Sequence, residues 1–187
     1  MSISGRNIVA EDIEMGAQQH RIKKEKAATT GTIVHEYAEH FSLGLKPEIP
    51  TDEQARNGVL AFLKWIEAEG LKIQNPEQLV YSKQWDYAGI ADAEATKDGK
   101  LYLLDYKTSK GIYNEMRFQV SAYMNALNEM KKGKYEGYYI LKFGKEDGNF
   151  ETLYVPATEA KKDFKAFIGC LAIRRRENEL PKWNAKS

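Results

Sequence analysis

The stretch ADAEATKDGKLYLLDYK, residues 91–107, contains two runs of alternating residues joined by Asp98-Gly99. Asp-Gly between alternating runs is the strongest short-range signal for a two-residue type I′ β-hairpin, because both central residues of that turn need positive φ. The sequence therefore predicts that these residues form two antiparallel strands with a fixed register.

The register decides which side chains meet. Lys97 faces Lys100 across the turn, and continuing the pairing places Asp92 directly opposite Asp105. Opposed like charges lie with Cβ atoms roughly 5 Å apart and destabilise a strand pair, so this arrangement needs a reason. On the other face small residues meet large ones, as in a packed core layer: Ala91 meets Tyr106, Ala93 meets Leu104 and Ala95 meets Tyr102.

Lys107 follows Asp105 by two residues and leaves the same face of the strand. A strand-end salt bridge is the ordinary interpretation of a lone D-x-K. A divalent cation is the alternative, because Mg²⁺ or Mn²⁺ is held by one or two carboxylates with water and substrate phosphate. Lys107 would then contact a phosphate oxygen or the attacking water. A bulge would instead shift the register and leave Asp92 and Asp105 as unrelated surface acids. The turn, the core layer and the acid pair together favour the metal site.

The remaining elements follow from periodicity and from start and stop signals. Gly31 is expected to separate two N-terminal helices. A capping box of Thr51 and Gln54 is expected to begin a third helix, which ends at Gly70. The expected helices and strands are helices at 9–26, 32–41, 113–131 and 158–178, and strands at 78–83, 87–97, 100–107, 137–143 and 150–155.

The chain is expected to form one α/β domain over residues 1–187, with a central mixed β-sheet flanked by helices. N-terminal helices (about 1–75) would pack on a core of about 76–180. The net charge is only +1, from 28 Lys and Arg against 27 Asp and Glu, so a polyanion would be held by local basic patches. Candidate patches, each also explained as a solvated helix face, are RIKKEK (21–26), KKGK (131–134) and RRR (174–176).

Cys170 is the only cysteine, which excludes an internal disulfide, a cysteine-based zinc site and an iron–sulfur cluster. It lies in the apolar run FIGCLAI (167–173), where we expect a buried thiol. That run is too short to span a bilayer, and the N-terminal residues lack the pattern of a signal peptide. We therefore expect a cytoplasmic protein in a reducing compartment, without membrane contact. The sequence has no P-loop motif, so ATP is not expected as a cofactor.

Two further polar features have alternative interpretations. Gln119 and Tyr123 are i and i+4 on the expected helix 113–131, so their side chains point from the same face. In one interpretation they contact DNA or position catalytic groups. In the other they form a buried polar pair whose hydrogen bonds are satisfied by backbone. In HEYAEH (35–40), Glu39 stands where the zinc motif H-E-x-x-H has its second histidine, so that motif is excluded. His35 is then either a single metal ligand or an ordinary helix histidine.

Four segments together resemble the RecB-like exonuclease branch of the PD-(D/E)XK nuclease superfamily, whose core is restriction-endonuclease-like. In chain order they are GTIVHE (31–36), YAGIAD (87–92), LLDYKTSK (103–110) and QVSAY (119–123). Each motif alone is weak, and their joint occurrence in this order makes the resemblance specific.

The resemblance implies a role for each matched residue. Mg²⁺ or Mn²⁺, two ions per site, would be ligated by His35, Asp92, Asp105 and the Tyr106 carbonyl. Asp92, Asp105 and Lys107 would be the catalytic residues. Gln119 and Tyr123 match the auxiliary motif of the branch.

The chain departs from the family pattern in two ways. Ala91 stands in place of the proline of the superfamily name, and the cysteine cluster of many relatives is missing. The resemblance is therefore to stand-alone members without an iron–sulfur cluster, which trim single-stranded DNA ends. It implies DNA with single-stranded or free ends as the partner, and allows phage or host recombination proteins as further partners. The alternatives are a structure-selective endonuclease, a non-catalytic DNA-end-binding subunit and a plain interaction module.

Overall fold

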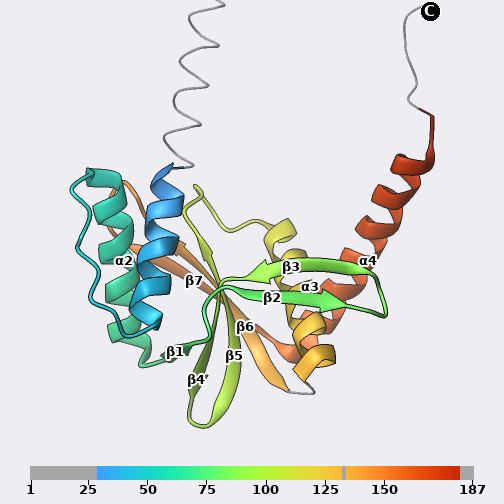
Figure 1. Cartoon of the computed structure of the whole chain (residues 1–187), viewed down its shortest axis with the longest axis horizontal. Coiled ribbons are helices and arrows are strands. Elements are labelled where there is room, and N and C mark those ends of the chain that lie inside the picture. Colours follow the sequence, from blue (N-terminus) through green and yellow to red (C-terminus); the bar gives the residue numbers. More distant parts are fainter. Residues whose placement is uncertain (1–28, 132–133, 182–187) are drawn as a thin grey trace, which may run out of the picture.

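A computed structural model describes residues 29–131 and 134–181. Its centre is a five-stranded sheet with helices on both faces (Figure 1). The pair β5–β6 is parallel and the other neighbouring pairs are antiparallel, which confirms the expected mixed sheet of an α/β domain. The strands, in their order across the sheet, are β1 (Lys72–Gln74), β4 (Ala93–Lys97), β5 (Lys100–Lys107), β6 (Tyr135–Phe143) and β7 (Phe150–Pro156).

Among the described residues, helices cover both faces of this sheet (Figure 1). A helix over residues 29–42 and α2 (Glu53–Glu69) lie on one face, where Phe62 and Trp65 pack against Leu104. The other face is covered by α3 (Asn114–Lys131) and α4 (Ala157–Glu179). Because side chains alternate along a strand, Leu104 and Tyr106 enter the first core while Leu103 enters the second.

The Asp98-Gly99 hairpin has the predicted turn and register. Asp98 and Gly99 have φ angles of 51° and 72°, as a type I′ turn requires. The small-against-large pairs Ala93–Leu104 and Ala95–Tyr102 form as expected. The predicted pair of Ala91 with Tyr106 is wrong, because Ala91 pairs with Gln78 instead. Pairing stops at Ala93–Leu104, so the ladder ends one residue before Asp92 would pair with Asp105.

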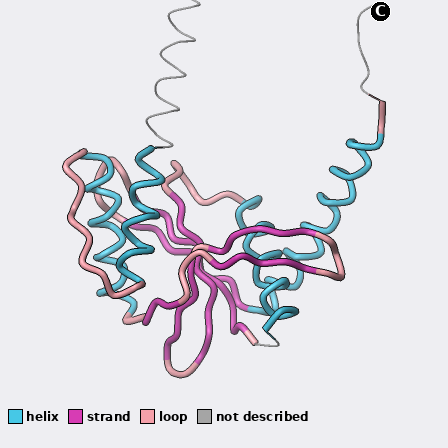
Figure 2. The backbone as a smooth tube through the Cα atoms, viewed as in Figure 1, coloured by secondary structure: helices cyan, strands magenta, loops and turns pink. Residues whose placement is uncertain are grey.

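The prediction of one strand over 87–97 is wrong. β3 (Tyr87–Ala91) ends before Asp92 and pairs with β2 (Gln78–Ser82) in a separate two-stranded sheet, which we call the ribbon. Figure 2 shows the ribbon extending away from the larger sheet and over α3. The physical reason is that the Asp92 carboxylate accepts the Tyr106 N–H, which leaves no ladder bond to continue the strand.

Two N-terminal predictions differ from the structure. Gly31 lies within the helix over residues 29–42 and breaks nothing there, because its missing side chain serves packing instead. The cap of α2 is Asp52, which accepts the Ala55 N–H at 3.0 Å, in place of the expected capping box. Gly70 ends α2 in the left-handed conformation as predicted. The expected helix at 9–26 and the RIKKEK run lie outside the described residues.

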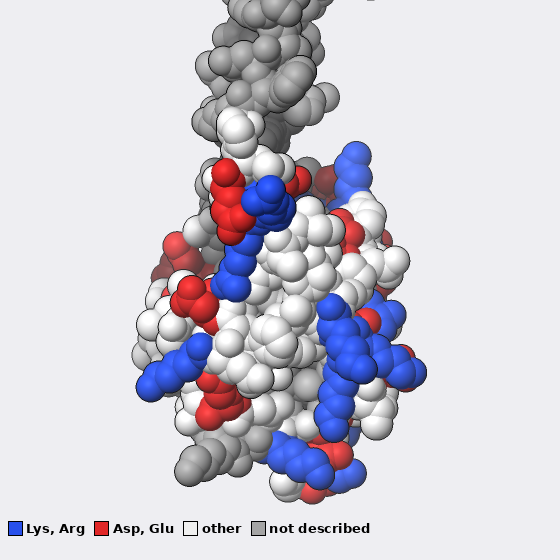
Figure 3. All heavy atoms as spheres, turned by 90° about the vertical axis from the view of Figure 1, so that its right-hand side faces the viewer, with Lys and Arg blue, Asp and Glu red and all other residues white. Residues whose placement is uncertain are grey.

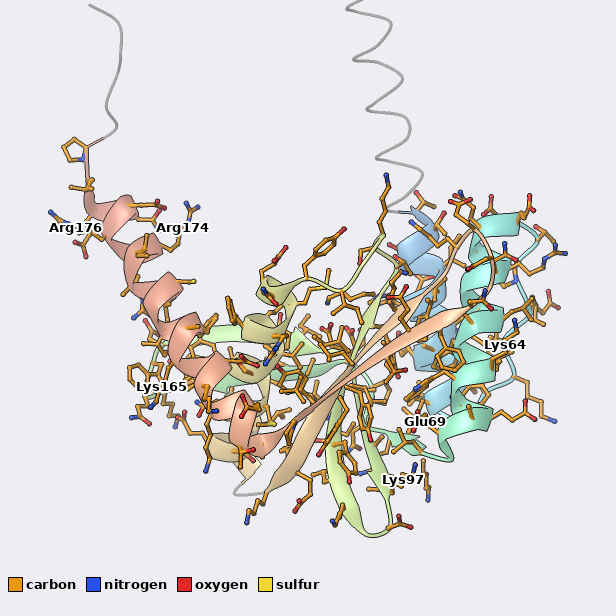
Figure 4. The ribbon with its side chains drawn as sticks, turned by 180° about the vertical axis from the view of Figure 1, so that it is seen from behind. Lys64, Glu69, Lys97, Lys165, Arg174 and Arg176 are labelled. Atoms are coloured by element: carbon orange, nitrogen blue, oxygen red, sulfur yellow. The ribbon has the colours of Figure 1, made fainter. Side chains whose placement is uncertain are left out.

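The expectation of a buried Cys170 is also wrong, because its side chain is exposed. The first half of α4 is tied to α3 by a two-pronged ion pair between Arg117 and Asp163. The second half extends past the sheet, and Figure 4 shows Arg174 and Arg176 on this exposed part. Within the apolar run around Cys170, Phe167 packs against Tyr87 of the ribbon, whereas Cys170 and Ile173 are exposed. No described helix is both long and apolar enough to cross a membrane.

Candidate active site

The site forms where β3, β4 and β5 meet. Asp92 lies in the break between β3 and β4, and one of its oxygens accepts the Tyr106 N–H at 2.6 Å. Asp105 lies in β5 and is only 3% exposed. The two acids are therefore neighbours as predicted, although a side chain–backbone contact and not a strand ladder places Asp92 there.

Lys107 and Asp105 form a close ion pair, with Nζ 2.6 Å from Oδ2. This confirms that both side chains leave the same face of β5. The strand-end salt bridge is therefore present, and Lys107 occupies the Oδ2 atom of Asp105.

His35 reaches the site from the helix over residues 29–42. Its Nδ1 atom lies 3.7 Å from Asp92 Oδ1, and its ring packs edge-on against Tyr106 with centroids 5.8 Å apart. A glycine brings this helix close, because a Cβ on Gly31 would lie 2.8 Å from the Thr108 hydroxyl oxygen. The structure thus places His35 beside Asp92 and Tyr106.

Gln119 and Tyr123 lie on α3 and bond to each other, with Gln119 Nε2 donating to Tyr123 Oη at 2.8 Å. The Gln119 side chain is exposed, so the pair is not a buried one satisfied by backbone. The charges of Asp105, Lys107 and Asp92 all act on the Tyr123 hydroxyl, whose pKa is raised mainly by burial. The auxiliary residues therefore border the acid pair.

Burial dominates the electrostatics of the site. It raises the pKa of Asp92 and of Asp105 to about 6, although the Tyr106 N–H and Lys107 oppose this for Asp92 and Lys107 does so for Asp105. Burial and then the Lys107 charge lower the pKa of His35. The two carboxylates are thus desolvated more than Lys107 compensates, and an added cation would favour their ionised form.

The donors suit a hard divalent cation, since they are carboxylate oxygens and an imidazole nitrogen. Asp105 Oδ2 is buried and is held by the Lys107 ammonium at 2.6 Å. In residues 29–131 and 134–181, however, no three His, Cys, Asp or Glu side chains gather closely enough to hold one ion. Binding by His35, Asp92 and Asp105 together would require Lys107 to turn away from Asp105 and the donors to draw in.

Two residues near the site were missed by the sequence argument. Glu77 donates its backbone N–H to the Asp92 carbonyl at 2.9 Å, and its charge acts on both Asp92 and His35. Gly89 lets β3 approach α3, since a Cβ there would lie 2.4 Å from the Tyr123 ring. The alternation in QLVYS (78–82) against YAGIA (87–91) was the available signal, because it pairs these strands and so places Glu77 next to Asp92.

Comparison of the sequence with protein-family models finds no match, and comparison with curated proteins finds none. The structure is similar to the crystal structure of a protein from Eubacterium rectale named "putative exonuclease", with a TM-score of 0.52. The two chains are 14% identical, and the similarity covers 81% of this chain and 69% of the other. At this identity the similarity shows a shared fold.

We expect Gly89→Ala to lower the free energy of unfolding by about 1 to 3 kcal/mol, because the added methyl group overpacks against Tyr123. Denaturant unfolding measures the change. Gly169→Ala on α4 is the matched control, since a Cβ there meets no atom within 4 Å, and it should be neutral or stabilising. The double variant Gly89→Ala/Tyr123→Leu should lose less unfolding free energy than the sum of the losses of the two single variants. Additive losses would contradict the steric explanation.

Without metal, we expect Asp92 and Asp105 to lower the free energy of unfolding as pH rises from about 4 to about 6, an effect that the lowered pKa of His35 partly opposes. The folded state keeps protons on Asp92 and Asp105 in this window, whereas the unfolded state has released them. Asp105→Asn should roughly halve the slope of the unfolding free energy against pH. At pH 7 this variant should be at least as stable as the wild type. Denaturant titrations in EDTA measure both quantities. Asp98→Asn in the exposed β4–β5 turn should keep the wild-type slope. Unfolding of Asp105→Asn in EDTA would mark Asp105 as a structural ion-pair member.

Proposed function

We propose that the chain is a metal-dependent deoxyribonuclease of the RecB-like branch of the PD-(D/E)XK superfamily, acting as an exonuclease on single-stranded DNA ends. One observation carries the proposal: the desolvated acids Asp92 and Asp105 adjoin each other with Lys107 beside them. Asp105 is buried and Asp92 half-buried, and the pKa of each is raised to about 6. Acids with raised pKa values cluster at functional sites, because catalysis needs groups whose pKa is tuned to the reaction. The fold shared with a protein named "putative exonuclease" supports the same class.

The proposed ligands are the Asp92 and Asp105 carboxylates, the His35 imidazole and the Tyr106 carbonyl. When bound, Mg²⁺ or Mn²⁺ supplies Lewis-acid charge beside the phosphodiester and makes water a better nucleophile. The Tyr106 N–H holds the Asp92 carboxylate in a fixed orientation, which preorganises one ligand. Lys107, released from Asp105, donates to a non-bridging phosphate oxygen and stabilises the negative charge that develops there.

Gln119 and Tyr123 act at the border of the site. Their mutual hydrogen bond fixes the Tyr123 hydroxyl, and the exposed Gln119 amide remains accessible to a DNA backbone. Hydrolysis adds water across the P–O bond, so the phosphorus gains the oxygen of water and the leaving sugar oxygen gains a proton. The chain needs no ATP for this chemistry.

End-labelled single-stranded DNA, linear and circular, incubated with Mg²⁺, Mn²⁺ or EDTA, tests the proposal. We expect shortening of the linear strand that requires the metal, with the circle left intact. Asp105→Asn should reduce the rate by at least about a thousandfold, since it removes a ligand charge. Cleaved circles would indicate the structure-selective endonuclease instead. Binding of ends without cleavage in either metal would indicate a non-catalytic subunit, and binding indifferent to ends and metal an interaction module.

His35→Ala is expected to weaken metal affinity by about 10- to 100-fold and slow cleavage, while DNA binding in EDTA stays unchanged. Mn²⁺ should restore more activity than Mg²⁺, because it binds an incomplete ligand set more strongly. In the wild type, activity should fall as pH drops through the pKa values near 6 of the acids, and more metal should partly restore it. His40→Ala, on the same helix and exposed, is the control. Equal metal titrations for both variants would remove His35 from the site.

A further inference from the structure

The outer face of the ribbon carries exposed apolar side chains. Leu79 and Ile90 are cross-strand partners, and they are 70% and 55% exposed. Tyr81, which is 39% exposed, comes next on β2 and faces the exposed Ala88. We call these four residues the ribbon strip. Contiguous exposed apolar side chains are unusual on a soluble surface and mark binding sites.

The ribbon strip is held rigidly from behind. The inner face of the ribbon packs on α3, with Val80 fully buried. At the turn, Glu129 of α3 accepts hydrogen bonds from the Ser82 hydroxyl and from two backbone N–H groups. Arg175 of α4 donates to two backbone carbonyls of the same turn, at 2.6 and 2.8 Å. The strip is therefore a preorganised surface, with little ordering left to be done on binding.

One end of the ribbon strip adjoins the candidate active site. The β2–β3 register continues past Leu79–Ile90 to Glu77 and Asp92, whose backbone atoms are joined by a hydrogen bond of 2.9 Å. At the other end the same alternation reaches the exposed Lys83, with Arg175 at the turn. Figure 3 shows this end of the molecule as a broad uncharged area with both basic and acidic side chains at its edges. The strip thus runs from the acid pair to the turn of the ribbon, where Lys83 and Arg175 lie beside Asp86 and Glu129.

We propose that the ribbon strip binds the unpaired bases of a single nucleic acid strand whose phosphodiester lies at Asp92 and Asp105. This inference rests on the proposed function and adds the path of the substrate. Apolar side chains and a tyrosine suit the faces of bases. The Tyr81 hydroxyl contacts Asp86, which restricts the ring on the surface.

The spacing of the ribbon strip favours a single strand over a duplex. Side chains on one face of a strand repeat every ~6.7 Å, because each residue rises ~3.3 Å and alternate residues share a face. Stacked nucleotides in a duplex strand repeat every ~3.4 Å. One base per side chain therefore requires an unstacked strand. A partner protein or a second copy of this chain would leave the continuity with the acid pair unexplained.

Fluorescence anisotropy in EDTA, where no cleavage occurs, tests the ribbon strip separately from catalysis. The probes are a labelled oligothymidylate and an abasic strand of the same length. In the double variant Leu79→Thr/Ile90→Thr we expect the Kd for oligothymidylate to rise at least about tenfold. Tyr81→Thr should raise this Kd by a similar factor. Neither variant should change the Kd for the abasic strand. Threonine keeps the strand propensity at these exposed positions. The matched control, Leu45→Thr/Ile49→Thr, removes two exposed apolar side chains from the loop before α2 and should bind as the wild type does.

Three outcomes would overturn the inference. The first is wild-type affinity of the strip variants for oligothymidylate, and the second is equal affinity of the wild type for both probes. The third is a wild-type dimer in sedimentation that the strip variants convert to monomers without a change in Kd, which would assign the strip to a second copy. Base-dependent binding without cleavage in either metal would refute the proposed nuclease alone, and cleavage with unchanged Kd would refute the strip alone.

Discussion

The contact between the Asp92 carboxylate and the Tyr106 N–H, at 2.6 Å, is the interaction on which the structure around the site depends. It takes the place of a ladder bond, so the chain leaves the five-stranded sheet at Asp92 and pairs β3 with β2. The same bond holds the Asp92 side chain beside Asp105. One hydrogen bond therefore divides the strands between two sheets and assembles the acid pair.

The acid pair is costly in the arrangement described, and this cost is informative. Asp105 is almost fully buried, and desolvation raises the pKa of both carboxyls although Lys107 is close. A sequence selected for stability alone would place apolar residues at such positions. Retaining two acids and a lysine at the end of a buried strand is the pattern expected where charge is required for chemistry.

Close packing at glycines gives the site its three-dimensional form. Gly31 lets the helix that carries His35 approach Thr108, and Gly89 lets β3 approach Tyr123. Both contacts join elements that are distant in sequence, and neither glycine has the positive φ that would have explained it locally. A glycine retained for close approach is invisible to turn rules, which is why Gly31 was expected to break a helix that it lies within.

The amino-acid sequence by itself determined the β4–β5 hairpin, because Asp98-Gly99 sets both turn and register, and it determined α3 and the β6–β7 pair through periodicity. It also indicated that Asp105 and Lys107 share a face, since strand side chains alternate. Only the tertiary structure decided that β3 leaves the sheet at Asp92, that His35 lies 3.7 Å from that acid, and that Cys170 is exposed. Each of these depends on which distant group satisfies a hydrogen bond or covers a surface, and local sequence patterns carry no information about such contacts.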